Sequence, residues 1–295
     1  MLTEIPDNVP EQKRQLLERL VNDLSQVEGM AAIALGGSYA SNTQHDTSDL
    51  DIGLYYFESR PFSISDIKGL AARYETLGSP TVTGFYEWGA WVNGGAWIHN
   101  PQSKVDFLYR NLDQIQHTIE AAQQGISHHD YDQQPAYGFY SVIYLAETQI
   151  CIPLYDPQGL ITKLKRQVEV YPPLLKEKVI ANSLWSAEFT LLHGRGFAAR
   201  GDIYNTVGCL TRAAANLTQA LFALNERYFI RDKQVMETMA EFAHLPEGYI
   251  QQVCKVLAKP GSTADELTWA VSELEGSWRS VVGMEGVNYK PQFKV

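Results

Sequence analysis

Two acidic residues one position apart, Asp49 and Asp51, have the clearest capacity for chemistry in this chain. They lie in the run Ser48-Asp49-Leu50-Asp51, which continues into apolar residues typical of a strand. Side chains at positions i and i+2 of a strand point to the same face, so the two carboxylates are expected side by side. A cation would relieve their repulsion. Mg²⁺ suits this arrangement because it takes one or two carboxylates together with substrate phosphates.

A turn of small residues, Gly36-Gly37-Ser38, separates the apolar run 30–35 from the acidic pair. The backbone N–H groups of such a turn, together with a serine hydroxyl, can bind phosphate oxygens. Taken alone, the turn is a common loop, and an Asp-x-Asp pair is most often a turn or a helix cap. Together they predict a site for a nucleotide and its metal ion.

The stretch Gly37-Ser38-Tyr39-Ala40, followed by Ser48-Asp49-Leu50-Asp51, resembles the signature of the DNA polymerase β-like nucleotidyltransferase superfamily, particularly its minimal and antibiotic-modifying members. The resemblance extends to about residue 110. It implies a small mixed sheet flanked by helices. It also implies that Gly37 and Ser38 bind the β- and γ-phosphates of the nucleotide.

A third carboxylate is part of the pattern in that superfamily, on a neighbouring strand. The segment Lys104-Val105-Asp106-Phe107 places Asp106 in an otherwise ordinary alternating strand, and the resemblance gives this residue the third position. The resemblance implies that Asp49, Asp51 and Asp106 hold two Mg²⁺ ions, with Mn²⁺ as an alternative, and act in catalysis.

The implied reaction transfers a nucleoside monophosphate from a nucleoside triphosphate, with ATP as the expected donor, to a hydroxyl group. A small-molecule acceptor such as an aminoglycoside or lincosamide is expected, because an acidic chain attracts a cationic ligand. Two alternatives stay open. One is the modification of a protein partner, as by antitoxin-like nucleotidyltransferases, and the other is a nucleotide-binding regulator without turnover.

Two residues beyond the matching stretch are further candidates. Glu188 lies among apolar neighbours in the helical segment 174–200. It is either a partly exposed helix residue or, by resemblance to the antibiotic nucleotidyltransferases, the base that acts on the acceptor hydroxyl. Related members often carry Arg-Gly where this chain has Ser41-Asn42. Arg195 or Arg200 is therefore the candidate to bind the triphosphate.

Two other groups of residues invite a functional interpretation. Trp88, Trp91 and Trp97 could stack on a base or a substrate ring, although packing in a small sheet is the commoner role of tryptophan. His128 and His129 stand in a polar stretch without zinc-type spacing, which favours a solvated linker over a metal site.

The composition is that of an ordinary globular protein, with 295 residues, 45% of them hydrophobic and 20% charged. The net charge of −10 opposes general nucleic-acid binding, since Lys and Arg supply most of that affinity, so no nucleic-acid partner is expected. No segment resembles a secretion signal or a membrane span, which predicts a cytoplasmic protein. The widely spaced cysteines are expected to be buried free thiols: Cys151, Cys209 and Cys254.

The patterns predict an α/β nucleotidyltransferase domain over residues 1–126 and an all-α helical bundle over residues 127–295, joined by the polar segment 127–135. The first domain is expected to contain helices 10–27, 63–77 and 111–124, strands 30–35, 49–56, 81–86 and 105–109, and a hairpin turn at Gly94-Gly95. Short breaks separate the expected helices of the bundle: 138–149, 158–170, 174–200, 202–227 (capped by Asp202), 232–243, 248–258 and 263–282.

Overall fold

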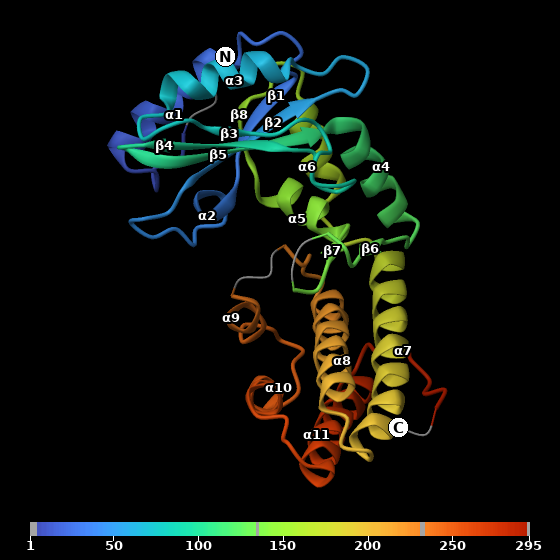
Figure 1. Cartoon of the computed structure of the whole chain (residues 1–295). Helices are drawn as coiled ribbons and strands as arrows, with labels where there is room; N and C mark the ends of the chain where they lie inside the picture. Colours follow the sequence, from blue (N-terminus) through green and yellow to red (C-terminus); the bar gives the residue numbers. More distant parts are fainter. Residues whose placement is uncertain (1–4, 134–135, 231–233, 294–295) are drawn as a thin grey trace. The chain divides into compact units, whose positions relative to one another are not determined.

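The computed structural model describes residues 5–133, 136–230 and 234–293, and these residues form two compact units. The first unit takes the chain up to Glu120 together with Tyr144–Val170. The second unit takes Ala121–Ile143 and the chain from Tyr171 onward. Figure 1 shows a sheet with helices in the first unit and mainly helices in the second.

A mixed sheet in the order β3-β4-β5-β2-β1-β8 is the centre of the first unit. β2 and β5 are parallel, and all other neighbouring strands are antiparallel. The strands are β1 (Ala32–Leu35), β2 (Leu50–Tyr56), β3 (Thr81–Val82), β4 (Gly95–Asn100), β5 (Ser103–Asn111) and β8 (Ile152–Tyr155).

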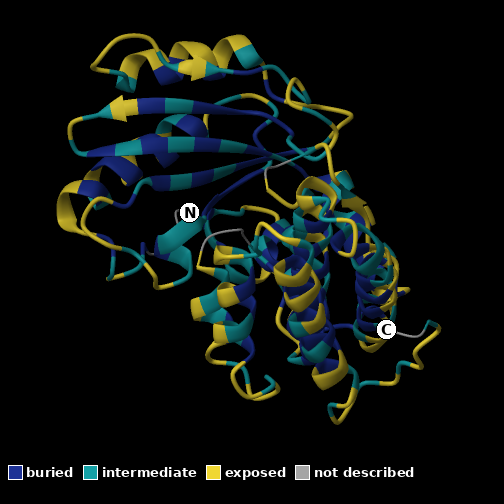
Figure 2. Ribbon diagram, turned by 60° about the horizontal axis from the view of Figure 1, so that its bottom comes forward, coloured by how far each residue is buried: buried dark blue, intermediate teal, exposed yellow. Residues whose placement is uncertain are grey.

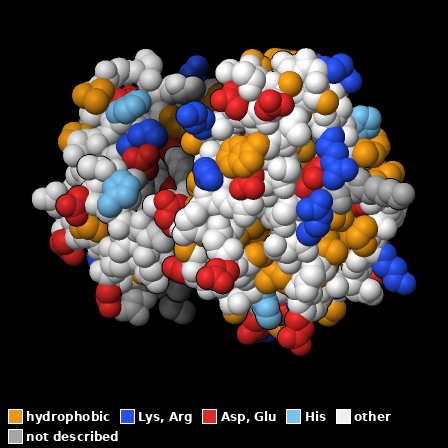
Figure 3. All heavy atoms as spheres, turned by 90° about the horizontal axis from the view of Figure 1, so that it is seen from below, with side chains coloured by type: hydrophobic (Ala, Val, Ile, Leu, Met, Phe, Trp, Pro, Cys, Tyr) orange, Lys and Arg blue, Asp and Glu red, His pale blue; other side chains and the backbone are white. Residues whose placement is uncertain are grey.

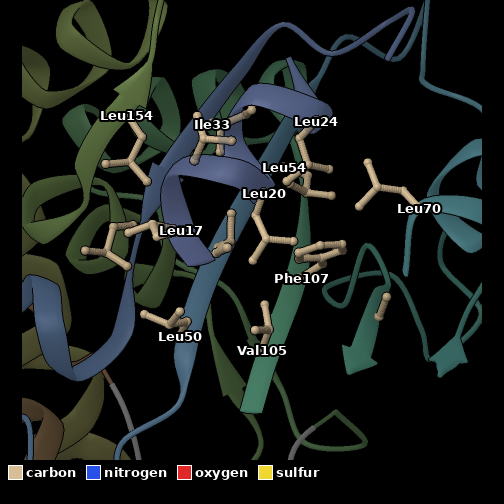
Figure 4. Packing of buried hydrophobic residues seen from close by; sticks show 14 of the residues in the cluster. Leu17, Leu20, Leu24, Ile33, Leu50, Leu54, Leu70, Val105, Phe107 and Leu154 are labelled. Carbon is tan, nitrogen blue, oxygen red and sulfur yellow. The ribbon is translucent and has the colours of Figure 1, made fainter. Parts of the chain in front are cut away.

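One face of this sheet forms the core of the first unit. Along β5, buried and half-buried positions alternate strictly, and the same alternation is visible as dark blue and teal along the strands in Figure 2. The buried positions of β2 and β5 pack against α1 (Glu11–Leu24) and α3 (Ile64–Tyr74). Figure 4 shows this packing, with Leu17, Leu20 and Leu24 of α1 beside Leu54 and Phe107. The opposite face of the sheet is therefore available for polar groups.

The remaining helices of the first unit are α2 (Gly37–Ala40), α5 (Val142–Ile150) and α6 (Leu160–Gln167), and α4 (Leu112–Gln123) runs from the first unit into the second. The second unit contains a short hairpin, β6 (His129–Asp130) and β7 (Phe139–Tyr140), and the helices α7 (Pro173–Ala198), α8 (Ile203–Leu224), α9 (Val235–Met239), α10 (Tyr249–Ala258) and α11 (Ala264–Val282). α7 and α8 pack along each other, and α11 packs against both.

The expected fold class, an α/β unit with a small mixed sheet flanked by helices and a helical C-terminal region, is confirmed. Several helix ends were also predictable. Ser63 caps α3 by accepting a hydrogen bond from the Asp66 N–H, and Asp202 caps α8 by accepting one from the Asn205 N–H. Within the described ranges, no helix is both long enough and apolar enough to cross a membrane.

The sequence patterns missed the edge strand β8 of this sheet and the two short strands β6 and β7. Residues beyond 127 were expected to be helical, but β8 pairs with β1 and completes one edge of the sheet. For this reason the segment Tyr144–Val170 belongs to the first unit. The observed division of the chain thus differs from a single boundary between residues 126 and 127.

The region between α3 and β5 also differs from expectation. The strand predicted over 81–86 ends at Val82, and the β4–β5 hairpin turns after Asn100 instead of at Gly94-Gly95. The segment after Val82 leaves the sheet in a turn over residues 85–88, where Tyr86 adopts the left-handed conformation, with φ of 58°. Thr83 holds the start of this loop to β4, since its hydroxyl accepts a hydrogen bond from the Gly95 N–H.

Two of the three cysteines are more exposed than the sequence suggested. All three cysteines are free, but only Cys151 is buried, whereas Cys209 is half-buried and Cys254 is exposed.

The surface charge is mixed in sign. On the face of the molecule drawn in Figure 3, basic side chains lie among acidic ones. The negative net charge therefore does not make that face uniformly acidic.

Candidate active site

The register of three adjacent strands brings the predicted acids together on the face opposite the core. Asp51 of β2 lies directly opposite Asp106 of the parallel strand β5. Trp97 of the antiparallel strand β4 lies opposite Asp106 on its other side. All three occupy half-buried positions between buried neighbours, so their side chains share one face of the sheet. A row Asp51–Asp106–Trp97 thus crosses three strands.

Lys104 connects this row to the third acid. Its Nζ lies 2.9 Å from Asp49 Oδ2 and 3.3 Å from Asp106 Oδ2, and donates a hydrogen bond to each. Asp49 directly precedes β2, and Lys104 is two positions before Asp106 on the same strand face. An ammonium group therefore stands between two of the three carboxylates. Lys104 was not among the predicted site residues, although its i, i+2 relation to Asp106 was a usable signal.

The small-residue turn is fastened beside Asp51. The Gly36 N–H donates a hydrogen bond of 2.8 Å to the backbone carbonyl of Asp51. Gly37 has a φ of +57°, and a Cβ atom on it would lie 1.7 Å from Asp51 Oδ2. Only glycine fits there, because any side chain would collide with the carboxylate. Ser38 follows in α2, so both predicted phosphate-binding residues stand next to the acidic row.

The acids are short of positive charge. Burial, followed by the charges of Asp106 and Asp49, raises the pKa of Asp51 to about 6. Burial also raises the pKa of Asp106, against the opposing effect of Lys104. Asp106 Oδ1 is buried and lies 3.2 Å from Lys104 Nζ, but accepts no well-formed hydrogen bond from any described residue. Such a carboxylate cluster is electrostatically incomplete without a further cation.

Comparisons with known proteins bear on this geometry. Residues 17–87 match the family model of the nucleotidyltransferase domain, a stretch that includes Gly37, Ser38, Asp49 and Asp51. The chain carries a nucleotidyltransferase domain. Nucleotidyl transfer is accordingly its general activity, with a nucleoside triphosphate as the implied substrate. Asp106 lies outside the matched residues and joins the site through strand register alone.

The other comparisons add a second region and one structure. Residues 143–233 match a domain of unknown function, DUF4037, and this stretch includes Glu188 and Arg195. A nucleotidyltransferase-like protein from Exiguobacterium sibiricum 255-15 is similar in structure, with a TM-score of 0.45 and 12% sequence identity, over 92% of this chain and 75% of that one. No curated protein matches the chain.

The carboxylates of Asp49, Asp51 and Asp106 are suitable ligands for a divalent metal ion. Carboxylate oxygens are the ligands that Mg²⁺ prefers, and the buried Asp106 Oδ1 accepts no well-formed hydrogen bond from the described residues. In the arrangement described, however, no three His, Cys, Asp or Glu side chains among the described residues are grouped closely enough to hold an ion. The Lys104 ammonium occupies the space between Asp49 and Asp106, so an ion could bind there only after that group moved.

The raised pKa of Asp51 predicts how the stability of the metal-free protein depends on pH. Its pKa is about 6 in the folded state, against 3.8 as the ordinary value, so its contribution to stability is complete below pH 3.8 and is lost as the pH rises through 6. Asp51→Asn should therefore stabilise the metal-free protein at pH 7.5, by up to about 3 kcal/mol. The gain should shrink toward pH 4.5. Urea unfolding in EDTA at both pH values measures this difference.

The exposed carboxylate Asp66, replaced by asparagine, is the matched control and should give a small difference at both values of pH. An Asp51→Asn effect that stays the same from pH 4.5 to pH 7.5 would contradict the raised pKa.

Glu188 is held inside the second unit by the C-terminal segment. It is fully buried in α7 and accepts hydrogen bonds from the Tyr289 hydroxyl at 2.5 Å, the Phe293 N–H at 2.6 Å and the Gln292 N–H at 2.9 Å. Its observed role is to anchor this segment to α7. Action as the catalytic base would require the segment to leave, and that role stays a prediction.

The anchoring role predicts a loss of stability on substitution. Glu188→Gln puts an amide group where a carboxylate accepted hydrogen bonds from two backbone N–H groups, leaving at least one buried donor unpaired. The free energy of unfolding should fall by about 1–3 kcal/mol. Urea unfolding measures the loss, and Glu237→Gln on the exposed surface of α9 is the control. Unchanged stability in Glu188→Gln would show that the segment does not depend on this carboxylate.

Arg195 and Arg200 have contacts within the second unit. The Arg195 guanidinium pairs with the buried Glu275 of α11, with Nη2 2.7 Å from Oε2. Arg200 lies with its guanidinium carbon 5.4 Å from the centre of the Phe197 ring. Binding of a triphosphate by Arg195 would compete with this ion pair, and it too stays a prediction.

The expected solvated linker contains the short strand β6, which pairs with β7 beyond the end of the linker. His129 stacks flat on Tyr140, with ring centres 4.0 Å apart, and belongs to no metal-binding group among the described side chains. Residues 134 and 135, the end of the expected linker, lie outside the described residues.

Proposed function

We propose that this nucleotidyltransferase transfers a nucleoside monophosphate from a nucleoside triphosphate, with ATP as the expected donor, to a hydroxyl group of a small molecule. The observation that supports this most is the gathering of Asp49, Asp51 and Asp106 on one face of the sheet, beside the Gly37 turn. A protein that only bound nucleotides would have no need to keep three acids together at an electrostatic cost.

The acids would hold Mg²⁺, with Mn²⁺ as an alternative. Asp49 and Asp51 would hold two ions between them, and Asp106 would hold the one beside the acceptor. When bound, these ions supply a lowered pKa for the acceptor hydroxyl and positive charge against the departing pyrophosphate.

The chain's own groups would do the rest. The Gly37 N–H and the Ser38 hydroxyl would bind the β- and γ-phosphates and orient the triphosphate toward Asp51, while the Gly36 N–H holds the turn to the Asp51 carbonyl. Asp106 Oδ1 is buried, and Lys104 Nζ lies 3.2 Å from it without a well-formed hydrogen bond; once Lys104 has moved, this oxygen would receive the proton of the acceptor hydroxyl. Positioning and charge, more than covalent chemistry, account for catalysis of this type.

The acceptor we propose is a cationic small molecule, in the class of the aminoglycoside or lincosamide antibiotics. The net charge of −10 and the local excess of carboxylates support a cation. A cytoplasmic setting, where ATP and Mg²⁺ are available, is part of this proposal. Transfer to a protein, or nucleotide binding without turnover, are the competing outcomes of the test.

The test is incubation of the full chain with each labelled nucleoside triphosphate, Mg²⁺ and a panel of acceptors, with pyrophosphate release and product mass as readouts. We expect a product heavier than one acceptor by one nucleoside monophosphate. The Asp49→Asn/Asp51→Asn variant is the control for contaminating activity. Tight nucleotide binding with no product from small molecules or proteins would favour the regulator instead.

A further inference from the structure

A pair of stacked tryptophans stands at the end of the acidic row. Trp97 lies opposite Asp106 in the β4–β5 register, on the face that carries the acids. Its ring stacks on that of Trp88, with ring centres 4.6 Å apart and planes at 28°. Trp88 is 48% exposed, so the pair presents aromatic surface to solvent beside a catalytic carboxylate.

These two rings do not belong to the core. The aromatic cluster of the core lies on the other face of the sheet and consists of Tyr56, Phe62, Phe85 and Tyr109. Trp91, the third tryptophan of this region, contacts Tyr144, and its backbone carbonyl accepts a hydrogen bond from the Tyr144 hydroxyl. Trp88 and Trp97 therefore form a separate surface that the packing of the first unit does not explain.

The local structure fixes the pair in place. The indole of Trp97 extends over Gly95, where a Cβ atom would come within 3.1 Å of the ring. Trp88 stands in a loop closed by hydrogen bonds from the Tyr86 N–H to the Asn93 carbonyl and from the Gly84 N–H to Glu87. Because the loop and the glycine hold both rings, the surface is formed before any ligand arrives, which lowers the entropic cost of binding.

The order of the strands decides which substrate this surface would meet. The Gly36-Gly37 turn follows β1 and is attached to β2, whereas Trp97 lies on β4, beyond β5. The phosphate-binding turn and the tryptophans thus flank the acids Asp51 and Asp106 from opposite sides. In nucleotidyl transfer the attacking and leaving oxygens lie roughly in line, so the acceptor enters opposite the pyrophosphate. That side is the tryptophan side.

We propose that Trp97 and Trp88 form the stacking surface for a ring of the acceptor and thereby select acceptors whose hydroxyl group is carried on a ring. This inference rests on the proposed transfer to a hydroxyl. An aromatic face attracts the flat face of a sugar or of a heterocycle, and a protonated amine on that ring would add a cation–π contribution. The residues determine specificity for the acceptor and do not bind the nucleotide.

The experiment measures probe binding to the full chain by calorimetry, with Mg²⁺ and a non-hydrolysable ATP analogue present. Three probes that carry a ring are compared, namely a neutral sugar, an amino sugar and a nucleoside: methyl β-D-glucopyranoside, glucosamine and adenosine. Putrescine provides a charge without a ring. Trp97→Ala and Trp88→Ala are compared with Trp269→Ala, which removes a similarly exposed tryptophan of the second unit. Trp97→Phe keeps an aromatic face in case the alanine variant unfolds.

We expect at least one ring probe to bind and its affinity to fall about tenfold in Trp97→Ala and in Trp88→Ala, the size of one lost stacking contact. Trp269→Ala should leave it unchanged, Trp97→Phe should lie between, and putrescine should not distinguish the variants. Affinity for the ATP analogue should stay within about twofold in every variant.

Three results would overturn the proposal: ring binding unaffected by both alanine variants, no binding of any ring probe to the natural chain, or a loss of ATP-analogue affinity in Trp97→Ala. The last would assign the surface to the nucleobase. Tryptophan-dependent ring binding without pyrophosphate release from any acceptor would instead refute the proposed transfer and leave the ring-binding surface standing.

Discussion

Asp106→Asn is expected to lower kcat by about two or more orders of magnitude, with little change in the affinity for the nucleoside triphosphate. Asparagine keeps the size of the side chain, but its amide cannot take a proton and ligates a hard cation weakly. Asp49 and Asp51 would still serve the nucleotide. The measurement is kcat with any acceptor that the panel identifies, together with the nucleotide Kd by calorimetry.

The matched control for Asp106→Asn is Glu18→Gln, which also removes one negative charge from the first unit, at an exposed position on α1. It should keep nearly full activity. Because Asp106 also pairs with Lys104, the melting temperature of the variant has to be compared with that of the natural chain. Full activity of a folded Asp106→Asn protein would remove this residue from the proposed catalytic set.

The double substitution Asp49→Asn/Asp51→Asn is expected to abolish turnover and to uncouple nucleotide binding from metal binding. In the proposed site the phosphates and the carboxylates would together complete one coordination shell, so nucleotide affinity of the natural chain should rise at least tenfold when Mn²⁺ is added. Without the two carboxylates the affinity should be the same with and without the ion. The fold should persist, since the substitutions relieve repulsion among the acids.

Calorimetric titration of a non-hydrolysable triphosphate, with Mn²⁺ and with EDTA, measures this coupling directly. The exposed Asp66→Asn variant serves again as the control for charge. If the natural chain bound the nucleotide equally well with Mn²⁺ and with EDTA, the proposed metal site would be contradicted, whatever the turnover measured for the chain.

The acids of the site were predictable because they depend on local rules. The two-residue period of a strand placed Asp49 and Asp51 together, and the same period marked Asp106 as a charge in an apolar strand. Lys104 was passed over because its partnership with Asp49 depends on how β2 and β5 align, which joins residues 55 positions apart. Register of this kind is set by the whole sheet and not by either strand alone.

Other misses have equally specific causes. β8 spans only four residues and contains Pro153, which argues against a strand unless the strand lies at an edge, as this one does. Glu188 looked like a residue on the surface of a helix because the segment that buries it, which includes Tyr289, lies about a hundred positions away. Helical periodicity reports the face of a helix but not what covers it.

The position of Lys104 would make uptake of a metal ion by the proposed site an exchange of cations. The ammonium group already pairs with Asp49 and Asp106, so an arriving ion would gain only the difference between its own attraction to these carboxylates and that of the lysine. The metal-free protein is thereby spared part of the repulsion among its acids. For the same reason a departing ion would leave carboxylates that Lys104 can partly neutralise, which would favour release of the ion together with the pyrophosphate.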